Sequence, residues 1–255
     1  NSNGEAMMSW NWRANGGITA ANSVGSTSSV TQVDPSGAFS IVTYPAITSG
    51  ASASGTIGHG MSVAPEFIIH KQVTAGSGWW TQVPNLLTDA GYFLELNSAG
   101  GQTNLNGYGT MNVPTTSVFT VNGVQGVGGG GGTYVAYCFA NIEGYCNVGS
   151  YNSNTSTDGA FVYTGFSPAF VLVKGIVSGA NWTMIDNKRN GFNPIPESLM
   201  PPSAGASYTS AAPFADLLSN GFKIRTVNAV LGDANYDPYV YLAFAKNPFK
   251  YATGK

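Results

Sequence analysis

Asp233, Asn235 and Asp237 stand at alternate positions, which is the spacing of the first half of a calcium-binding loop. Such a loop also needs a glycine at its sixth position and a glutamate at its twelfth. Here Pro238 stands at the sixth position, and no glutamate stands at the twelfth. We therefore expect a capped turn next to Gly232. Calcium is the alternative, and we expect no other cofactor.

Residues that perform acid, base or nucleophilic catalysis are few and scattered. His59 lies between two glycines and His70 in an apolar, strand-like run, and neither has a serine nucleophile in a Gly-x-Ser-x-Gly turn nearby. Glycoside hydrolysis requires two positioned carboxylates, whereas the twelve acidic residues of this chain occur singly. We therefore predict that the protein is not an enzyme, assign no catalytic residue, and set aside a polysaccharide depolymerase.

Aromatic residues are better candidates for ligand contact. Trp79 and Trp80 are neighbours in a predicted strand, so their side chains point to opposite faces. Trp80 matches Trp182 in the repeat described below, which predicts that both pack in the core and that Trp79 is exposed. An exposed indole beside Gly76 and Gly78 suits the C–H face of a sugar ring, and a contact with another subunit fits equally well. The other candidate ligand-binding residues are Tyr108, Tyr208 and Tyr236.

The chain carries few charges. Ten basic and twelve acidic residues make up 9% of its 255 residues and give a net charge of −2, against roughly 25% charged residues in ordinary soluble domains. Nucleic-acid binding requires clustered Lys and Arg, and a membrane span requires roughly 20 apolar residues in a row; we expect neither nucleic acid nor membrane as a partner. The compact group Asp186, Lys188 and Arg189 is expected to fix a loop by ion pairing, with partner binding as the alternative.

An internal repeat of about 105 residues is the clearest feature of the sequence. This period is the size of one small domain and is too long for solenoid or propeller repeats. The matching stretches, in order, are 39–44 with 146–151, 64–71 with 167–174, 80–83 with 182–185, 117–121 with 220–224, and 134–140 with 239–245.

Each copy contains about seven short runs rich in Val, Ile, Phe, Tyr and Thr, bounded by Gly, Pro, Asn and Ser. This pattern predicts an all-β fold: two tandem, jelly-roll-like β-sandwich domains related by duplication, preceded by an extra N-terminal strand. The predicted boundaries are 1–36 for that strand and a linker, 37–142 for the first sandwich, and 143–255 for the second.

Four local expectations accompany this division. The extra strand covers 6–14, resembles the last strand of each copy, and is followed by a linker over 18–36. The run 134–140 is apolar on both faces, which predicts a central strand covered on both sides. A helical turn is predicted over 211–219, ended by Asn220-Gly221. Cys138 is expected to act as a buried hydrophobic residue, with a bridge to Cys146 as the alternative.

These motifs, taken in order, resemble a family of marine bacteriophage virion proteins. Such proteins carry tandem copies of an uncharacterised domain of about 105 residues and are often described as tail-fibre proteins. The resemblance covers residues 37–250 and implies a virion location, but it supplies no catalytic residue. The stretches that carry it are 134–140, 143–145, 149–151, 158–174, 181–189, 218–225 and 243–249.

The resemblance and the composition together predict a non-enzymatic bacteriophage virion structural protein. The first hypothesis is a tail fibre or appendage that contributes to attachment to host-surface glycans. The alternative is a capsid decoration, head fibre or tail-shaft subunit without a receptor role. Expected partners are other virion subunits, including copies in a homo-oligomer (a trimer by analogy), and a host glycan. The protein would be assembled in the host cytoplasm and exposed on the particle.

Overall fold

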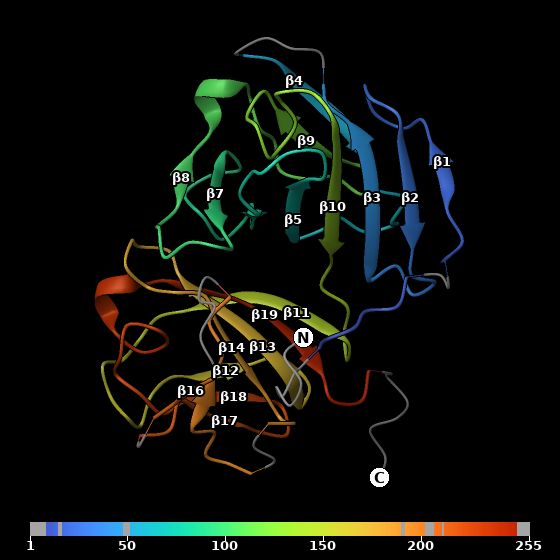
Figure 1. Cartoon of the computed structure of the whole chain (residues 1–255). Helices are drawn as coiled ribbons and strands as arrows, with labels where there is room; N and C mark the ends of the chain where they lie inside the picture. The colour runs from blue at the N-terminus through green and yellow to red at the C-terminus, as the bar shows by residue number, and fades with distance from the viewer. Residues whose placement is uncertain are drawn as a thin grey trace, which may run out of the picture.

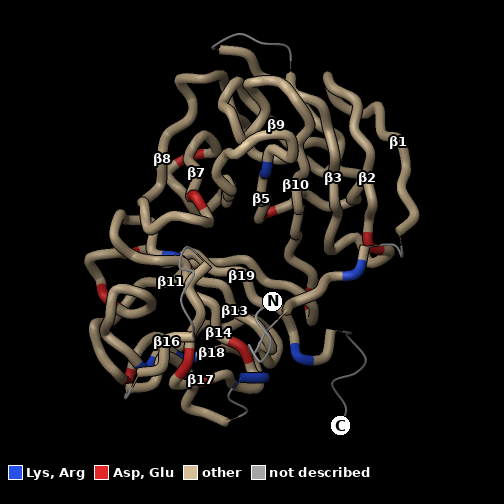
Figure 2. Tube along the Cα trace, viewed as in Figure 1, with Lys and Arg blue, Asp and Glu red and all other residues tan. Residues whose placement is uncertain are grey.

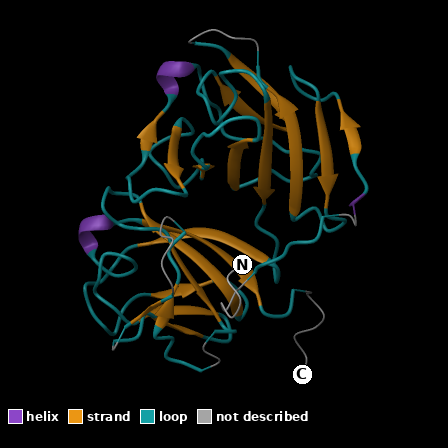
Figure 3. Ribbon diagram, in the orientation of Figure 1, coloured by secondary structure: helices purple, strands orange, loops and turns teal. Residues whose placement is uncertain are grey.

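The computed structural model describes residues 9–14, 17–47, 52–189, 192–201, 207–210 and 212–248. Regular structure in these residues consists almost wholly of antiparallel β-strands in several sheets, with single 3-10 turns at η2 (Asn106–Tyr108) and η3 (Ala234–Tyr236) (Figure 3). The prediction of an all-β fold is therefore confirmed. Among the described residues, no helix has the length and apolar character that crossing a bilayer requires.

The N-terminal half of the molecule is built on an eight-stranded antiparallel sheet, which lies at the top of Figure 1. A two-stranded sheet, β4 (Ser54–Gly58) with β9 (Val118–Asn122), accompanies it. The order of the large sheet is β1 (Ala20–Asn22), β2 (Ser29–Val33), β3 (Phe39–Pro45), β10 (Thr133–Phe139), β5 (Phe67–Gln72), β6 (Trp80–Gln82), β7 (Tyr92–Glu95) and β8 (Thr103–Asn104).

The C-terminal half is built on a four-stranded sheet in the order β11 (Cys146–Tyr151), β19 (Tyr239–Ala245), β13 (Pro168–Gly175) and β14 (Thr183–Asp186). A three-stranded sheet, which we call the outer sheet, has the order β12 (Phe161–Tyr163), β18 (Gly221–Ile224) and β17 (Ala215–Leu217). β15 (Glu197–Ser198) pairs with β16 (Tyr208–Thr209).

Each half has a core between its large sheet and its small sheet. A strand that borders such a core has an apolar residue at every second position, because successive side chains point to opposite faces of the sheet. The N-terminal core includes Val42, Tyr44, Ile57, Phe119, Tyr134 and Cys138. The C-terminal core includes Tyr151, Val162, Val171, Phe222, Tyr239 and Tyr241.

A third cluster, the central cluster, joins the two halves. It takes the opposite faces of both large sheets and includes Phe39, Phe67, Phe139, Phe170, Leu172, Trp182, Leu242 and Phe244. In β19, Tyr239 and Tyr241 face the C-terminal core, whereas Leu242 and Phe244 face the central cluster. β10 lies between β3 and β5 and likewise contributes to two clusters. The prediction of a central strand covered on both sides is confirmed.

Polar contacts hold the two halves together as well. The Trp182 Nε1–H donates to the Glu95 carbonyl oxygen at 3.0 Å. Backbone N–H groups of Gln102 and Gly179 donate to the carbonyl oxygens of Ile176 (2.8 Å) and Ala99 (2.9 Å). Directional hydrogen bonds and ring packing therefore act together at this junction.

The amino-terminal segment packs on this junction but does not form the predicted strand. The described part of the predicted 6–14 strand, residues 9–14, has no strand pairing, and residues 6–8 lie outside the described residues. Trp12 instead lies 5.9 Å from Phe139, 6.0 Å from Phe170 and 5.2 Å from Phe244 between ring centroids. The sequence pattern identified the apolar residues of this segment correctly. The indoles of Trp10 and Trp12, however, pack against aromatic rings of the large sheets, and the backbone of the segment does not pair with a strand.

Two further local predictions are wrong. The predicted linker over 18–36 contains β1 and β2, which extend the large sheet beyond β3. The predicted helical turn over 211–219 contains β17, and Ala211 lies outside the described residues. Asn220-Gly221 closes a hairpin, since the Leu218 N–H donates to the Gly221 carbonyl oxygen at 2.8 Å. In both places, pairing with a distant strand outweighs the local propensity.

The outer edge of β11 is covered by a side chain. β3 has β2 on its outer edge, whereas β11 is the first strand of its sheet. The Asn141 amide accepts a hydrogen bond from the Val148 N–H at 2.5 Å and donates one to the Val148 carbonyl oxygen at 3.2 Å. One side chain thus makes the two bonds that a neighbouring strand would make, which protects an exposed edge.

We expect Trp12→Ala to destabilise the protein by about 2 kcal/mol, because a half-buried indole that contacts both halves is lost. Urea unfolding measured by circular dichroism checks this value. Val73→Ala, at a 62% exposed position, is the control and is expected to change little. Equal unfolding midpoints for Trp12→Ala and the unmodified protein would show that the segment does not stabilise the junction.

Candidate functional site

A hollow between the two halves, which we call the central groove, forms a concave apolar surface. It has a volume of about 370 Å³. Its walls are the central faces of both large sheets and the amino-terminal segment, and the lining is almost wholly apolar. The lining residues are Trp10, Trp12, Phe39, Ile41, Ile69, Trp79, Leu96, Tyr137, Phe139, Phe170, Leu172, Met184, Pro201 and Leu242.

Trp79 presents its ring to this groove. Its side chain is 36% exposed, which agrees with the predicted outward direction. The indole plane is nearly parallel to that of Tyr137, at 17° with 6.5 Å between centroids, and the Lys71 Nζ lies 5.8 Å from the indole centroid. The Asn97 side-chain oxygen accepts a hydrogen bond from the Trp79 backbone N–H at 2.8 Å. The ring is therefore held in place while part of it remains open.

The predicted equivalence of Trp80 and Trp182 is wrong. Trp182 is fully buried in the central cluster, whereas Trp80 packs, partly buried, against the N-terminal core. The two side chains thus point to different sides of their sheets. Local alternation assigns Trp79 and Trp80 to opposite faces, but it does not say which face the other half of the molecule covers.

The three tyrosines predicted as ligand contacts are not brought together. Tyr108 belongs to η2 in the N-terminal half and is 50% exposed. Tyr208 belongs to β16, is 52% exposed, and lies 5.8 Å from Phe214 between centroids. Tyr236 belongs to η3 and packs against the C-terminal core. None of them lines the central groove.

The predicted capped turn at Asp233 is confirmed. The Asp233 carboxylate accepts the Asn235 backbone N–H at 2.9 Å at the start of η3. The Asp237 carboxylate accepts a hydrogen bond from the Ser153 backbone N–H at 2.8 Å, so it does not share a ligand-binding position with Asp233. Within the described residues, no group of three or more His, Cys, Asp or Glu side chains is arranged to hold a metal ion.

The histidines and cysteines are parts of cores. The His70 ring is fully buried, with its Nδ1 3.1 Å from the Tyr44 hydroxyl, and burial lowers its pKa to about 3. His59 is buried and contacts the Thr115 carbonyl oxygen at 3.1 Å. Cys138 and Cys146 are free thiols in different clusters, and burial raises the pKa of Cys138 to about 12. These groups are shielded and suit packing, as the sequence predicted for His70 and Cys138.

The Asp186 cluster fixes a loop, as predicted. The Asp186 carboxylate, 2% exposed, forms an ion pair with the Arg189 Nε at 2.6 Å. It also accepts the backbone N–H groups of Lys188 at 2.9 Å and Arg189 at 3.0 Å. The Lys188 side chain is exposed.

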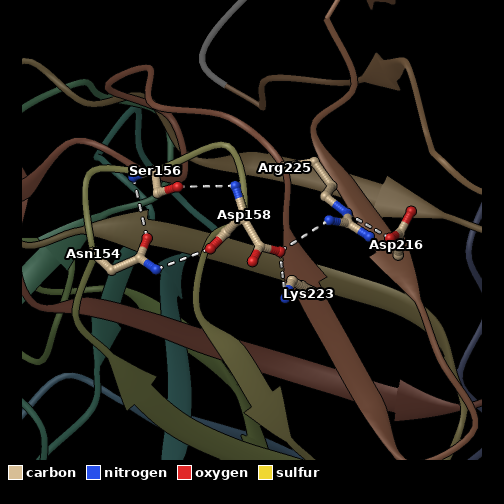
Figure 4. A network of polar contacts seen from close by, with 6 residues as sticks. All are labelled: Asn154, Ser156, Asp158, Asp216, Lys223 and Arg225. Atoms are coloured by element: carbon tan, nitrogen blue, oxygen red, sulfur yellow. Dashed lines mark hydrogen bonds and ion pairs between the residues drawn. The ribbon is translucent and has the colours of Figure 1, made fainter.

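A second charged network lies on the outer sheet and was not singled out from the sequence. Asp158 contacts the Lys223 Nζ at 2.7 Å and the Arg225 Nη1 at 3.3 Å, and the Arg225 Nε contacts Asp216 at 2.6 Å (Figure 4). The hydrogen bond and charge of Lys223 lower the pKa of Asp158, which favours its ionised carboxylate at neutral pH. Figure 2 shows how sparse charges are elsewhere, which makes this grouping distinctive.

The loop before β12 holds Asp158 in place. The Asn154 side chain accepts the Ser156 N–H at 3.2 Å and donates to the Asp158 carbonyl oxygen at 3.0 Å. The Ser156 hydroxyl accepts the Asp158 N–H at 3.1 Å. The sequence contained one usable signal: residues 161–163 alternate aromatic, aliphatic, aromatic, which predicts two aromatic side chains on one face.

Lys174 is a buried cation. Its side chain is fully buried, and the Nζ donates to the Ala180 carbonyl oxygen at 2.5 Å. No acidic side chain of the described residues forms an ion pair with it. Burial lowers its pKa to about 8.

Asp186→Ala is expected to lower the free energy of unfolding by about 3 kcal/mol, since it leaves the largely buried Arg189 guanidinium without its counterion. Urea unfolding provides the measurement. Lys188→Ala is the matched control in the same loop, with an expected change within about 0.5 kcal/mol. Equal losses in the two variants would contradict the ion-pair explanation.

The Lys174 pKa predicts a specific pH dependence. The unfolded chain binds more protons at this site between pH 8 and the ordinary lysine pKa of about 10.5, so stability rises with pH in that window. We expect a contribution of about 2 to 3 kcal/mol. Lys174→Met removes it. The difference in unfolding free energy between the two proteins is measured from pH 7 to 10, and a pH-independent difference would refute this assignment.

Comparison with known proteins places the chain in a family without assigning an activity. Searches of curated proteins and of solved structures find no match. The model of one protein family, described as a domain of unknown function, matches residues 1–248 and so spans both halves of the fold. The chain therefore belongs to the family of the domain of unknown function DUF7483.

Proposed function

We propose that this protein is a non-enzymatic structural protein of a bacteriophage particle, located in a tail fibre or similar appendage, and that it contributes to attachment to host-surface glycans. The resemblance of its motifs to phage virion proteins supports the location. The low content of charged residues and the buried histidines and thiols support a binding role over catalysis.

The observation that carries the attachment role is the position of Trp79. A ring that is 36% exposed and nearly parallel to Tyr137 offers a flat face to the C–H groups of a sugar. The Lys71 ammonium, near the same ring, offers N–H donors to hydroxyl groups. Lys71 lies in β5, and Trp79 directly precedes β6, the strand that pairs with β5, so the contact surface is preorganised.

A second candidate function is that of a virion subunit without a receptor role, such as a capsid decoration, head fibre or tail-shaft component. The almost wholly apolar lining of the central groove favours it, because such a lining suits side chains of another subunit better than many hydroxyl groups. Under this alternative Trp79 is buried in the assembled particle, in a homo-oligomer or against a different subunit.

We also propose that the two halves are copies of one unit, with the jelly-roll-like sandwich as the predicted type. The large sheets contain the matching orders β3-β10-β5-β6 and β11-β19-β13-β14. Tyr44 stacks on Tyr134 at 5.4 Å, and Tyr151 stacks on Tyr239 at 5.2 Å. The hydroxyls of the first tyrosine in each pair donate to the carbonyl oxygens of Val127 (2.7 Å) and Leu231 (2.9 Å). These contacts lie about 105 residues apart, as the repeat requires.

Trp79→Ala is expected to weaken binding of the purified protein to host cells and to immobilised host glycans by about ten-fold or more, as loss of a central aromatic contact does. Binding is measured as a saturation curve at a fixed ionic strength. Val73→Ala, on an exposed neighbouring segment, is the control and should bind normally.

Two outcomes would contradict the attachment role. One is the absence of saturable binding by the folded, unmodified protein. The other is full protection of Trp79 from an indole-modifying reagent in intact particles, combined with reactivity in the free protein. The second outcome would support the subunit without a receptor role.

A further inference from the structure

The outer sheet exposes two aromatic side chains on the side of the molecule away from the central groove. β12, β18 and β17 lie at the bottom of Figure 1, below the C-terminal core. Val162 faces that core, so its neighbours face solvent: Phe161 is 47% exposed and Tyr163 is 66% exposed. Two exposed aromatic side chains on one strand form a small apolar platform.

A glycine keeps this platform open. Gly221 is the cross-strand neighbour of Tyr163 in the β12–β18 register. A side-chain carbon at position 221 would lie 3.1 Å from the Phe161 ring and 2.1 Å from the Val162 carbonyl oxygen. Gly221 is itself buried, and the absence of a side chain at this position leaves room for the Phe161 ring.

Hydrogen-bonding groups stand directly beside the rings. Lys223 is the cross-strand partner of both Phe161 and Asp216. An aromatic, a basic and an acidic residue therefore lie in one row across the sheet. Both basic side chains contact Oδ1 of Asp158. Among the described residues no contact is made to its Oδ2, and the Asp158 side chain is 79% exposed, so this oxygen is available as an acceptor.

We propose that Phe161, Tyr163 and the Asp158–Lys223–Arg225 network form a binding site for a neutral hexopyranose unit of a glycan. A pyranose has an apolar C–H face and a rim of hydroxyl groups that both donate and accept. The two rings meet the apolar face. The Asp158 carboxylate accepts from one hydroxyl, and the Lys223 ammonium and Arg225 guanidinium donate to its neighbours. This site rests on the proposed glycan attachment and adds the substrate class and a second point of contact.

The charges favour a neutral sugar over an anionic one. Asp158 and Asp216 already neutralise Lys223 and Arg225, two acids against two bases. A sugar carboxylate or sulfate would have to displace Asp158 or lie beside it, which like-charge repulsion opposes. The fixed loop keeps the network formed before a ligand arrives, which lowers the ordering cost of binding.

Saturation-transfer difference NMR on the full chain tests the site. The probes are the methyl glycosides of glucose, galactose, mannose and N-acetylglucosamine, with glucuronic acid as the anionic comparison. We expect signals from at least one neutral probe. Tyr163→Ala and Asp158→Asn should each reduce them roughly five-fold or more, whereas Tyr163→Phe, which keeps the ring, should retain most of the signal. Val113→Ala, at a 47% exposed position in the other half, is the control. Circular dichroism confirms that each variant is folded.

The outcomes separate this site from the Trp79 surface. The inference is overturned if no neutral probe gives a signal with the folded protein, if only glucuronic acid does, or if the signals survive both Tyr163→Ala and Asp158→Asn. Signals lost in Trp79→Ala alone would overturn it and leave the proposed function standing. Signals that depend on Tyr163 and Asp158 in a protein that does not bind host cells would support the site and refute the attachment role.

Discussion

Two sheets with apolar side chains on both faces impose the architecture of this protein. β10 and β19 each contribute to a core on one side and to the central cluster on the other. A sheet of this kind loses most of its hydrophobic stabilisation if either face meets water. The small sheets cover the outer faces, and each large sheet covers the inner face of the other. The junction is therefore part of the folding unit as well as a contact between halves.

The candidate binding surfaces follow from how incompletely this junction and the outer sheet are covered. Trp10 and Trp12 fill part of the space between the halves, and the remaining hollow is the central groove that Trp79 faces. On the outer sheet, Val162 is buried while its aromatic neighbours are exposed to solvent beside the Asp158 network. The groove is apolar and suits a protein or the face of one sugar, whereas the outer sheet offers both ring faces and hydrogen-bonding groups.

The charged side chains are few, and several of them have a defined structural role. Asp186 and Arg189 form an ion pair that organises a loop, and Lys174 is buried with a carbonyl oxygen as its partner. The Asp158 network is the exception, because its carboxylate is largely exposed and still fixed in direction. A polar network that is held in place and open to solvent is more useful for recognition than for stability, since exposed ion pairs contribute little to folding.

Local pattern in the sequence was enough to predict the all-β class, the strand-like run that contains His70, the double-sided burial of 134–140, the outward direction of Trp79 and the Asp186 loop. These features depend on the period-two alternation of strands and on contacts between near neighbours. Tertiary structure alone decided that β1 and β2 extend a sheet, that 215–217 form a strand, and that Trp80 and Trp182 face different cores. It also brought Asp158 to Lys223 and Arg225 from more than sixty positions away. Alternation tells which residues share a face, but only the packing of distant strands determines what that face meets.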